Sequence, residues 1–297
     1  MSALGWVPVI SIILIMFWTY YVYVIVLCLF TSQILGEKII LLTAIHPLLF
    51  MMMWCLYRAC FTAPRSPPAR YYLDEAEWSK LSYDFNWKKD KTTMDELRLR
   101  LELKTTAAES GYGIPHYCYY CKLLKPDRCH HCSKCNTCVL KMDHHCPWLN
   151  NCVGFHNYKY FLQFLGYVTF SIIFVIFTSL RFVIEFFGAM YMNSGSTTDV
   201  NGAQIVAMVF VDAIVALTIS PLLILHRDLI HHNVTTLENT RPVAWLGQRP
   251  DYHTFDLGPK ENFLQVFGDR KLCWFFPLFS SRGNGLTFPR PGSEETV

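Results

Sequence analysis

Four long apolar stretches constrain what this chain of 297 residues can fold into. They occupy residues 6–30, 39–61, 160–187 and 203–226, and few charged residues interrupt them. Each reaches the roughly 20 residues that a helix needs to cross a bilayer. Because lipid offers the backbone no hydrogen-bond partners, a helix is the expected form. The sequence therefore predicts an all-α membrane protein with four transmembrane helices.

The distribution of basic residues predicts how these helices are oriented. Of the 26 lysines and arginines, 15 lie in residues 62–159 and 8 in residues 227–297. The positive-inside rule therefore places both segments, and both termini, in the cytosol. The first apolar stretch lacks a basic n-region and a cleavage site, so we expect a retained span and not a signal peptide. The net charge of +3 gives no indication of nucleic-acid binding.

The chain divides into five predicted segments. They are transmembrane helices 1 and 2 (residues 1–61), a cytosolic linker (62–115), a Cys-rich zinc domain (116–156), transmembrane helices 3 and 4 (157–226) and a cytosolic C-terminal region (227–297). The charged composition of residues 72–109 favours a surface helix over a strand. The amphipathic stretch 263–279 is expected on the bilayer surface or against the spans. From Gly283 onward we expect a loose tail.

Eight of the twelve cysteines fall between Cys118 and Cys152. Cytosolic thiols are kept reduced, so such a cluster indicates metal binding or catalysis and not disulfides. Cys-x2-Cys steps occur at positions 118/121, 132/135 and 135/138, with histidines nearby, which is the spacing of zinc ligands. The segment is too polar for a core of its own and needs a metal to fold. Ligands suffice for two zinc sites with at least one cysteine left over, but spacing does not tell how they pair.

One cysteine, Cys146, follows directly on an acid and two histidines. His144 and Asp143 supply a base and an orienting acid, the arrangement that activates a thiol for acyl transfer. Nearby zinc and imidazolium charge also favour the reactive thiolate. Histidine–cysteine clusters are equally typical of metal ligands, so a zinc module that only recruits partners is the alternative at this point.

Several motifs together resemble the signature of the DHHC-type zinc-finger protein S-acyltransferases. They are Asp143-His144-His145-Cys146-Pro147-Trp148 with the following Asn150-Asn151-Cys152-Val153-Gly154, Thr235-Thr236-Leu237-Glu238 after the fourth span, and the aromatic stretch from Asn262 to Gly268. The resemblance extends over most of the chain and includes the position of the Cys-rich loop between the second and third spans. The stretches 5–9 and 140–142 are similar to an animal subgroup, which implies a multi-pass protein of Golgi, plasma membrane or other endomembrane.

The resemblance implies a two-step protein S-palmitoyltransferase. Cys146 would take a fatty acyl group from palmitoyl-CoA or another long-chain acyl-CoA and pass it to membrane-proximal cysteines of substrate proteins. His144 would be the general base and Asp143 its orienting acid. Two structural Zn²⁺ ions are implied, with interleaved ligands: Cys118, Cys121, His131 and Cys138 at one site, and Cys132, Cys135, His145 and Cys152 at the other. Cys129 would be surplus.

The bilayer is the expected location of the acyl chain, because burying a palmitoyl chain is worth on the order of 10 kcal/mol. Residues expected to contact it are Trp148, Phe161, Phe164, Thr19 and Ser171, the last two lying where the family closes its acyl cavity. Because both are small, we expect chains longer than sixteen carbons to be tolerated. For the three aromatic residues, helix packing or anchoring at the membrane surface is the alternative.

Other polar residues receive supporting roles. Basic groups placed near the motifs, and expected to meet anionic CoA unless they are plain surface charge, are Lys125, Arg128, His130 and Arg241. Thr235, Thr236 and Glu238 are expected to tie the chain to the catalytic loop, and Asn262 to hold backbone in the C-terminal motif. Asp212 lies within a span, where an ionisable group is costly. It could pair with another span, or it could indicate a four-span transporter.

Overall fold

The structure is a computed structural model that describes residues 3–77, 96–97, 99–103, 105–106, 116–192, 200–245 and 249–292. It forms two compact units. One contains the membrane helices, residues 2–58 and 160–226, and the other contains residues 59–159 and 227–297 together with Met1. Most of the predicted surface helix at 72–109 lies outside the described residues. Residues 75–77, 96–97 and 99–100 are helical, whereas Thr105–Thr106 form a strand, so the helix does not extend to residue 109.

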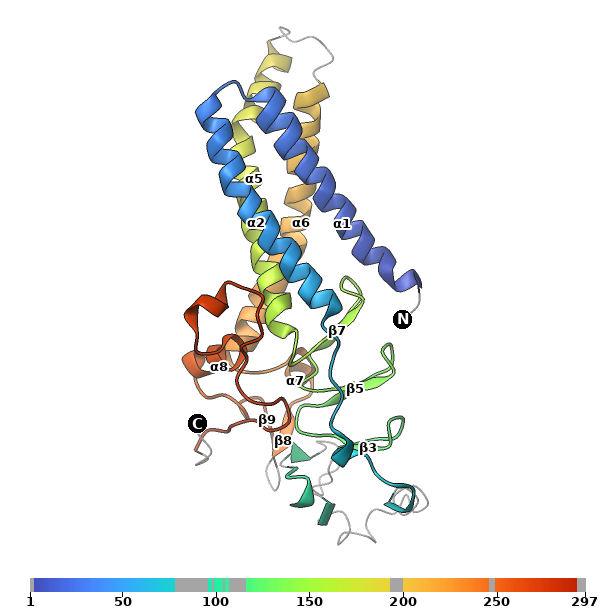
Figure 1. Cartoon of the computed structure of the whole chain (residues 1–297). Coiled ribbons are helices and arrows are strands. Elements are labelled where there is room, and N and C mark those ends of the chain that lie inside the picture. Colours follow the sequence, from blue (N-terminus) through green and yellow to red (C-terminus); the bar gives the residue numbers. More distant parts are fainter. Residues whose placement is uncertain are drawn as a thin grey trace. The chain divides into compact units, whose positions relative to one another are not determined.

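Four apolar helices confirm the predicted spans, and all four are longer than expected. They cover Leu4–Thr31, Leu35–Phe61, Tyr158–Tyr191 and Val200–His231, the last three being α2, α5 and α6. The first combines a short 3-10 turn (η1, Ala3–Trp6), α1 (Val7–Tyr20) and a π-helical stretch (η2, Tyr21–Thr31). The helices run side by side as a bundle (Figure 1).

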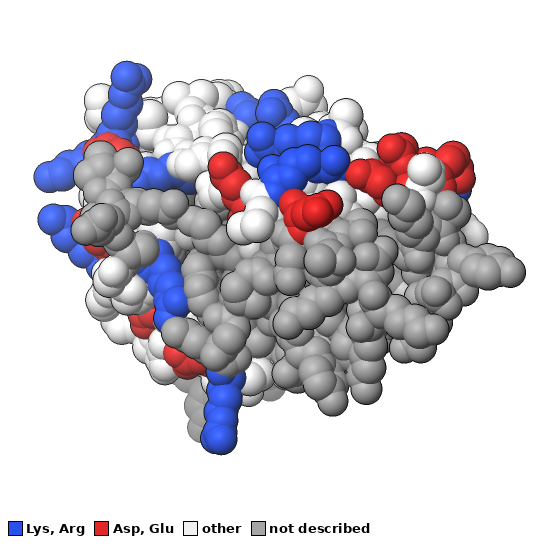
Figure 2. Space-filling view, turned by 90° about the horizontal axis from the view of Figure 1, so that it is seen from below, with Lys and Arg blue, Asp and Glu red and all other residues white. Residues whose placement is uncertain are grey.

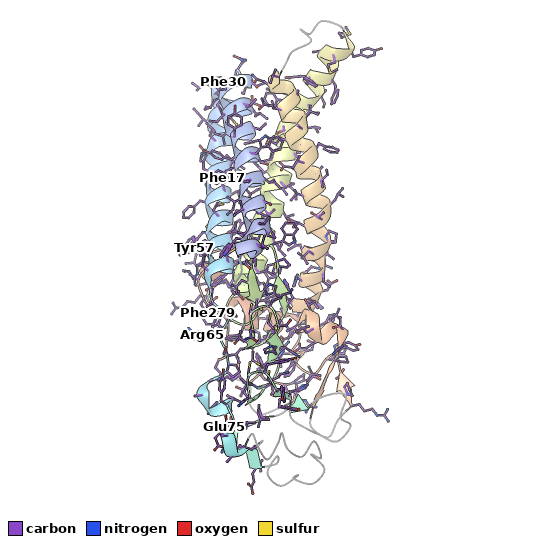
Figure 3. The ribbon with its side chains drawn as sticks, turned by 90° about the vertical axis from the view of Figure 1, so that its right-hand side faces the viewer. Phe17, Phe30, Tyr57, Arg65, Glu75 and Phe279 are labelled. Carbon is purple, nitrogen blue, oxygen red and sulfur yellow. The ribbon has the colours of Figure 1, made fainter. Side chains whose placement is uncertain are left out.

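Apolar side chains cover both the inside and the outside of this bundle. Tyr23, Leu27, Ile45, Ile205 and Met208 are buried in a common core between the helices. Large residues such as Phe17, Phe30 and Tyr57 remain exposed on the outside (Figure 3). A protein in water seldom exposes so many large apolar groups. This outer surface is therefore the one that lipid would solvate.

Polar groups inside the bundle pair with one another. The Tyr23 hydroxyl lies 2.7 Å from the hydroxyl of Thr178, and Arg58 donates to the Tyr160 hydroxyl at 2.7 Å. Thr19 donates to Asp212 at 3.3 Å, so the ionisable residue within the last span does pair with another span. Such contacts offset part of the cost of burying polar atoms in a medium without water.

Three short antiparallel hairpins dominate the second unit. They consist of β2 and β3 (Tyr117–Cys118 and Leu123–Leu124), β4 and β5 (His130–Cys132 and Thr137–Val139), and β6 and β7 (His144–Cys146 and Asn151–Val153). Their turns contain Lys122, Asn136 and Asn150, all with positive φ. Asparagine tolerates this left-handed conformation better than most residues, which favours tight turns at these positions.

The chain after the last span returns to pack on these hairpins. It forms α7 (Thr236–Thr240), β8 (Val243–Trp245), β9 (Pro250–Asp251), α8 (Pro259–Phe267) and the 3-10 turn η5 (Lys271–Trp274), and β8 pairs with β1 (Thr105–Thr106) as well as with β9. A further 3-10 turn, η3 (Ala69–Tyr71), follows the second span. Figure 2 shows basic and acidic side chains interspersed on one face of the protein, with no single sign of charge covering its described part.

The expectation of a loose tail from Gly283 onward is wrong for the described residues. Phe288 is 6% exposed and packs in a core with Phe155 and Phe255. Gly285, at a positive φ of 77°, lies against the Phe155 ring, where a Cβ atom would come within 2.8 Å. An aromatic residue after a glycine turn is enough to bury this segment, although its composition resembles that of a flexible end.

Gly154 provides a test of how tightly the hairpins pack. A Cβ atom there would lie 2.9 Å from the Leu140 carbonyl oxygen and 2.9 Å from Val139 Cγ1. We expect Gly154→Ala to lower the free energy of unfolding by about 1–3 kcal/mol, because the backbone has to move. Gly166→Ala in α5 is the control, because nothing lies within 4 Å of its added carbon. Thermal unfolding in detergent measures both, and equal midpoints for the two variants would contradict the close packing.

Candidate functional site

The three hairpins repeat one sequence frame every 14 residues, in residues 116–129, 130–143 and 144–157. Cys118, Cys132 and Cys146 occupy the same position in the frame, at the end of the first strand of each hairpin. The left-handed turn residues Lys122, Asn136 and Asn150 recur with the same period. The Cys-rich segment is thus three copies of one structural unit.

Strand register places histidine opposite cysteine in two of the three copies. His131 pairs with Cys138, and His145 pairs with Cys152. The first hairpin has Tyr117 opposite Leu124 at the equivalent place. Directly opposed residues on antiparallel strands have neighbouring side chains. The second and third hairpins therefore each present a ready-made pair of metal ligands.

Two Cys3His clusters form where consecutive hairpins meet. One contains Cys118, Cys121, His131 and Cys138, and the other contains Cys132, Cys135, His145 and Cys152, each with its ligand atoms within 4.8 Å of one another. Each takes two cysteines from the turn of one hairpin and a His–Cys pair from the next. Cys121 Sγ lies 3.3 Å from His131 Nδ1, and Cys135 Sγ lies 3.4 Å from His145 Nδ1. Four N and S donors this close fit tetrahedral zinc.

These two clusters are the same sets of residues that the family resemblance implied, and they are consistent with two zinc sites. Backbone N–H groups point at the sulfurs as well: those of Cys121 and Cys135 lie 3.4 Å from the sulfurs of Cys118 and Cys132. Such donors stabilise negative charge on a ligating sulfur. Cys129 is buried next to Cys138 but belongs to neither cluster.

Cys146 starts a third cysteine turn that is incomplete. Leu149 occupies the position that Cys121 and Cys135 fill in the other copies. The chain then enters α5 at Tyr158, so no further hairpin follows to supply a His–Cys pair. Three hairpins have two junctions, and one Cys3His cluster lies at each junction. Among the described residues, Cys146 belongs to neither of these two clusters. Its sulfur is left for other chemistry.

His144 and Asp143 lie beside this sulfur, as predicted. His144 Nδ1 is 2.6 Å from an Asp143 carboxylate oxygen, and the His144 side chain also hydrogen-bonds with Cys146. Burial alone would lower the pKa of His144, but the bonds to Asp143 and Cys146 outweigh it and raise the pKa to about 9. The imidazole therefore holds its proton strongly at neutral pH. A protonated imidazole next to a thiol favours the thiolate, which is the reactive form.

Asp143 is held in place from a distant part of the sequence. It is 2% exposed, and Thr236 donates to it twice, from its backbone N–H at 2.9 Å and from its hydroxyl at 2.8 Å. Thr235 caps the start of α7, where its hydroxyl accepts from the backbone N–H of Glu238 at 3.2 Å. The predicted tie between the Thr235–Glu238 motif and the loop before Cys146 is therefore present as direct hydrogen bonds to Asp143.

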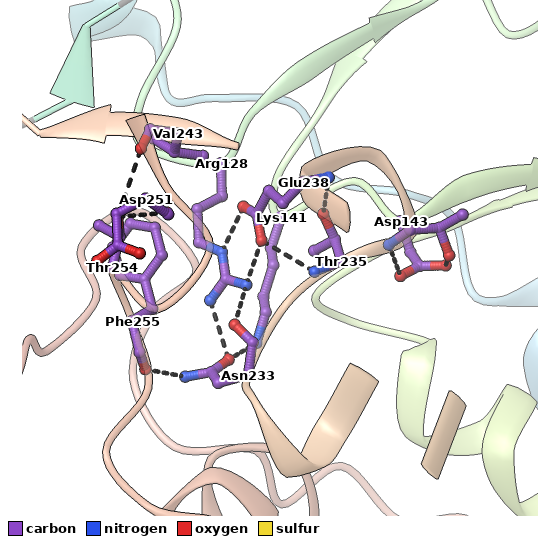
Figure 4. A network of polar contacts seen from close by, with 11 residues as sticks. Arg128, Lys141, Asp143, Asn233, Thr235, Glu238, Val243, Asp251, Thr254 and Phe255 are labelled. Atoms are coloured by element: carbon purple, nitrogen blue, oxygen red, sulfur yellow. Dashed lines mark hydrogen bonds and ion pairs between the residues drawn. The ribbon is translucent and has the colours of Figure 1, made fainter. Parts of the chain in front are cut away.

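Arg128 and Glu238 form a buried ion pair behind this loop (Figure 4). The Arg128 guanidinium donates to both Glu238 carboxylate oxygens, at 2.8 and 2.6 Å, and to the side chain and backbone oxygens of Asn233. It also lies over the ring of Phe255, 4.5 Å from the centroid. Burial would raise the pKa of Glu238, but Arg128 lowers it overall. The carboxylate therefore stays charged.

The same network contains a lysine that sequence reasoning had not singled out. Lys141 donates to the Asn233 side chain at 3.2 Å. Burial, and then the charge of Arg128, lower the pKa of Lys141 to about 7. A lysine two residues before Asp143 thus carries only part of its charge at neutral pH.

Two of the four residues predicted to meet CoA do not suit that role. Arg128 has a side chain that is 0% exposed and is fully engaged with Glu238 and Asn233, so it cannot reach a ligand in solvent. Burial lowers the pKa of His130 to about 4, which disfavours a cationic role for it. Lys125 is half-buried and Arg241 is exposed. Lys125 and Arg241 therefore remain candidates for contacting CoA.

Two asparagines position the site, and only one of them was foreseen. Asn262 donates to the His231 carbonyl at 2.6 Å and accepts from the Leu257 N–H at 2.9 Å, so it does hold backbone as expected. Asn151 lies opposite Cys146 and donates to the carbonyls of Ala59, Cys60 and Thr62. In the sequence, only the position of Asn151 in the motif, next to Cys152, indicated that it belongs to the site.

The helix unit brings together two of the residues predicted to contact the acyl chain. Thr19 and Ser171 line one partly open cavity between the helices, together with Asp212 and apolar residues such as Ile45 and Val168. Phe161 and Phe164 are buried, and Phe161 packs edge-on against His226, 4.9 Å between ring centroids. Trp148, in the other unit, is 57% exposed.

Taken together, four apolar spans and two Cys3His clusters between the second and third spans define a multi-pass membrane protein with a zinc-finger-like module. Residues 112–243 match the family described as DHHC palmitoyltransferase. The human Palmitoyltransferase ZDHHC20 is 38% identical over 289 residues, covering 96% of this chain and 76% of that protein. The rat Palmitoyltransferase ZDHHC2 is 39% identical over 287 residues, with coverages of 96% and 76%.

A zebrafish relative, Palmitoyltransferase ZDHHC20-A, is 39% identical over 287 residues, covering 96% of this chain and 78% of that protein. The chain belongs to the DHHC palmitoyltransferase family and is a protein palmitoyltransferase. The family signature contains the residues of the third hairpin, where the geometry leaves a cysteine outside both metal clusters.

The Arg128–Glu238 pair gives a prediction about stability. Arg128→Leu leaves the Glu238 carboxylate buried without its partner, so we expect a loss of about 3–5 kcal/mol in the free energy of unfolding. Arg227→Leu is the matched control, because Arg227 forms an exposed pair with Asp228 and such pairs contribute little. Chemical unfolding of the purified protein, followed by the release of zinc, measures both variants. A similar midpoint for the two would mean that the buried pair does not stabilise the fold.

Proposed function

We propose that the palmitoyltransferase reaction proceeds in two steps through a thioester on Cys146. The Cys146 sulfur attacks the carbonyl carbon of acyl-CoA, a new carbon–sulfur bond forms, and CoA leaves as a thiol. A cysteine thiol of a substrate protein then attacks the acyl-enzyme, and Cys146 leaves. The observation that carries the proposal is the incomplete third cysteine turn, which leaves this sulfur outside both metal clusters and beside His144.

His144 moves the proton in this scheme. The protonated His144 donates its proton to the departing CoA sulfur, and it then accepts the proton of the substrate thiol, so that the site returns to its starting state when Cys146 leaves. Asp143 holds the Nδ1 side of the ring at 2.6 Å, which fixes the orientation of the imidazole. Thr236 in turn fixes Asp143 through two hydrogen bonds. His145 is excluded as the proton carrier because it belongs to a metal cluster.

Zn²⁺ is the ion that we propose for both clusters. Three sulfurs and one imidazole nitrogen at each site suit zinc better than calcium or magnesium, which prefer oxygen. The ions would have a structural role, because all four ligands come from the protein at each site and none of them is Cys146. They would hold the hairpins that carry the reactive residues.

The acyl donor and the substrates follow from the membrane setting. We propose that the cavity lined by Thr19 and Ser171 receives the acyl chain, and that Lys125 and Arg241 meet the anionic CoA. Basic residues concentrate in residues 62–159 and 227–297, which supports a cytosolic location of the site and of both termini. Substrate proteins would present cysteines close to the bilayer. A Golgi, plasma-membrane or other endomembrane location, and the five predicted segments, remain predictions.

The two alternative functions receive less support. A silent zinc scaffold would not need the Asp143–His144–Cys146 chain of contacts, which the structure contains. A transporter was suggested by Asp212 alone. That residue hydrogen-bonds with Thr19 and lines a largely apolar cavity, which suits an acyl chain better than an ion.

Substitution of Cys146 tests the acyl-enzyme. Cys146→Ser should keep two zinc ions per chain and lose labelling by palmitoyl-CoA, because a serine hydroxyl is a far weaker nucleophile at neutral pH. His144→Ala should also keep both ions and slow labelling by about 10²–10⁴-fold. Zinc content and intact-protein mass are read from the same samples. Cys273→Ser is the control, since Cys273 lies in neither cluster.

Loss of about one zinc in Cys146→Ser would mean that Cys146 is a metal ligand, and the proposal would fail. Labelling of Cys146→Ser at the wild-type rate would place the acyl group on another residue. An unchanged rate in His144→Ala would remove the histidine from the proton transfer.

Side-chain volume in the cavity tests where the acyl chain lies. Thr19 and Ser171 are small, so the wild type should accept chains longer than sixteen carbons. Ser171→Tyr or Thr19→Phe should shift the preference toward shorter acyl-CoAs, because the added ring occupies the cavity. Competition between acyl-CoAs of different length, read by mass spectrometry, measures the shift. An unchanged preference in both variants would place the chain elsewhere.

A further inference from the structure

Two polar atoms in the membrane cavity have no hydrogen-bond partner among the described residues. They are Oδ2 of Asp212 and Oγ of Ser171. Asp212 is 4% exposed and Ser171 is 6% exposed, and both residues line the cavity between the helices. Leaving a polar group buried and unsatisfied is destabilising. A polar group on a ligand in the cavity would satisfy them.

Other hydroxyls on the same helices behave differently. Thr169 on α5 donates to the Leu165 carbonyl at 2.8 Å, and Ser220 on α6 donates to the Ala216 carbonyl at 2.7 Å. This bond to the preceding turn is the usual way for serine and threonine to satisfy their hydroxyls within a helix. Ser171 does not make it. Its hydroxyl is therefore available to a group inside the cavity.

Asp212 is held so that one oxygen is satisfied and the other is not. Thr19 on α1 donates to Oδ1 at 3.3 Å, which leaves Oδ2 available. Polar groups from three helices, α1, α5 and α6, thus line one cavity whose remaining walls are largely apolar. A few polar groups within an apolar pocket are what orients a ligand and gives it specificity.

We propose that this cavity selects fatty acyl chains that carry a hydroxyl group at the depth of Asp212 and Ser171. The inference rests on the proposed use of the cavity for the acyl chain. A hydroxyl both donates and accepts, so it can donate to Asp212 or accept from Ser171. A plain saturated chain would place methylenes against both atoms and leave them unsatisfied. A site with polar groups that match a hydroxyl binds an analogue without it less well.

A panel of acyl-CoAs tests this directly. Purified protein in lipid nanodiscs receives palmitoyl-CoA mixed with one monohydroxypalmitoyl-CoA at a time, with the hydroxyl at successive positions along the distal half of the chain. The 2-hydroxy compound, with its hydroxyl next to the thioester, is the control ligand. We expect one position, or two adjacent ones, to be preferred over palmitoyl-CoA by about tenfold. Intact-protein mass spectrometry reads the competition.

Variants of the cavity complete the test. Asp212→Leu combined with Ser171→Ala should abolish the preference for the hydroxylated chain, because both partners are removed. Asp212→Asn, which keeps a polar side chain, should retain much of it. Thr218→Val is the matched control on α6, since Thr218 is exposed and bonds to the Val215 carbonyl. Zinc content verifies that each variant is folded.

Three results would overturn the inference while the proposed function survives. In the first, palmitoyl-CoA labels Cys146 but no hydroxylated chain is preferred, as expected if water satisfies the two atoms. In the second, the preference persists in the Asp212→Leu, Ser171→Ala variant. In the third, it is lost equally in Thr218→Val. If wild-type Cys146 is not labelled by any acyl-CoA, the proposed function itself fails.

Discussion

The pairing of consecutive hairpins is the constraint on which the candidate site depends. A single hairpin presents at most two cysteines from its turn and one His–Cys pair from its strands, and these serve different clusters. Each cluster therefore requires two neighbouring copies, and a row of three copies contains an end that has no neighbour. The last cysteine turn stands at that end. The reactivity proposed for Cys146 follows from its place at the end of the repeat, together with Leu149 at the position where the other two copies have a second cysteine.

Contacts from the C-terminal region give the third hairpin its chemistry. Thr236 holds Asp143, which holds His144, while Glu238 two residues later in the same capping motif pairs with Arg128. A buried ion pair of this kind gains little over apolar packing but is costly to break. The ion pair therefore acts mainly by fixing the position of α7 against the hairpins, and less by its net contribution to stability. The Thr235–Glu238 motif thus contacts both the hairpins, through Arg128, and Asp143.

Much of this was predictable from the sequence, and the failures have physical reasons. Apolar length predicted the four spans, and cysteine spacing predicted the kind of metal site. Spacing left the pairing open because it depends on strand register, although the 14-residue repeat contained that information. Arg128 was expected at CoA because a sequence shows charge but not burial, and its partner Glu238 lies 110 positions away. Phe288 was assigned to a loose tail because its packing partners, Phe155 and Phe255, are likewise distant in the sequence.

The bonds from Thr236 to Asp143 have a consequence for biosynthesis. A ribosome completes the three hairpins before it has made α5 and α6, and Thr236 is translated only after both. Metal can thus stabilise the nascent module early, while the acid that orients His144 still lacks its two donors. These two hydrogen bonds can form only once the last span has been synthesised. The contacts proposed to support the reactive site are therefore completed after the membrane part of the chain has been made.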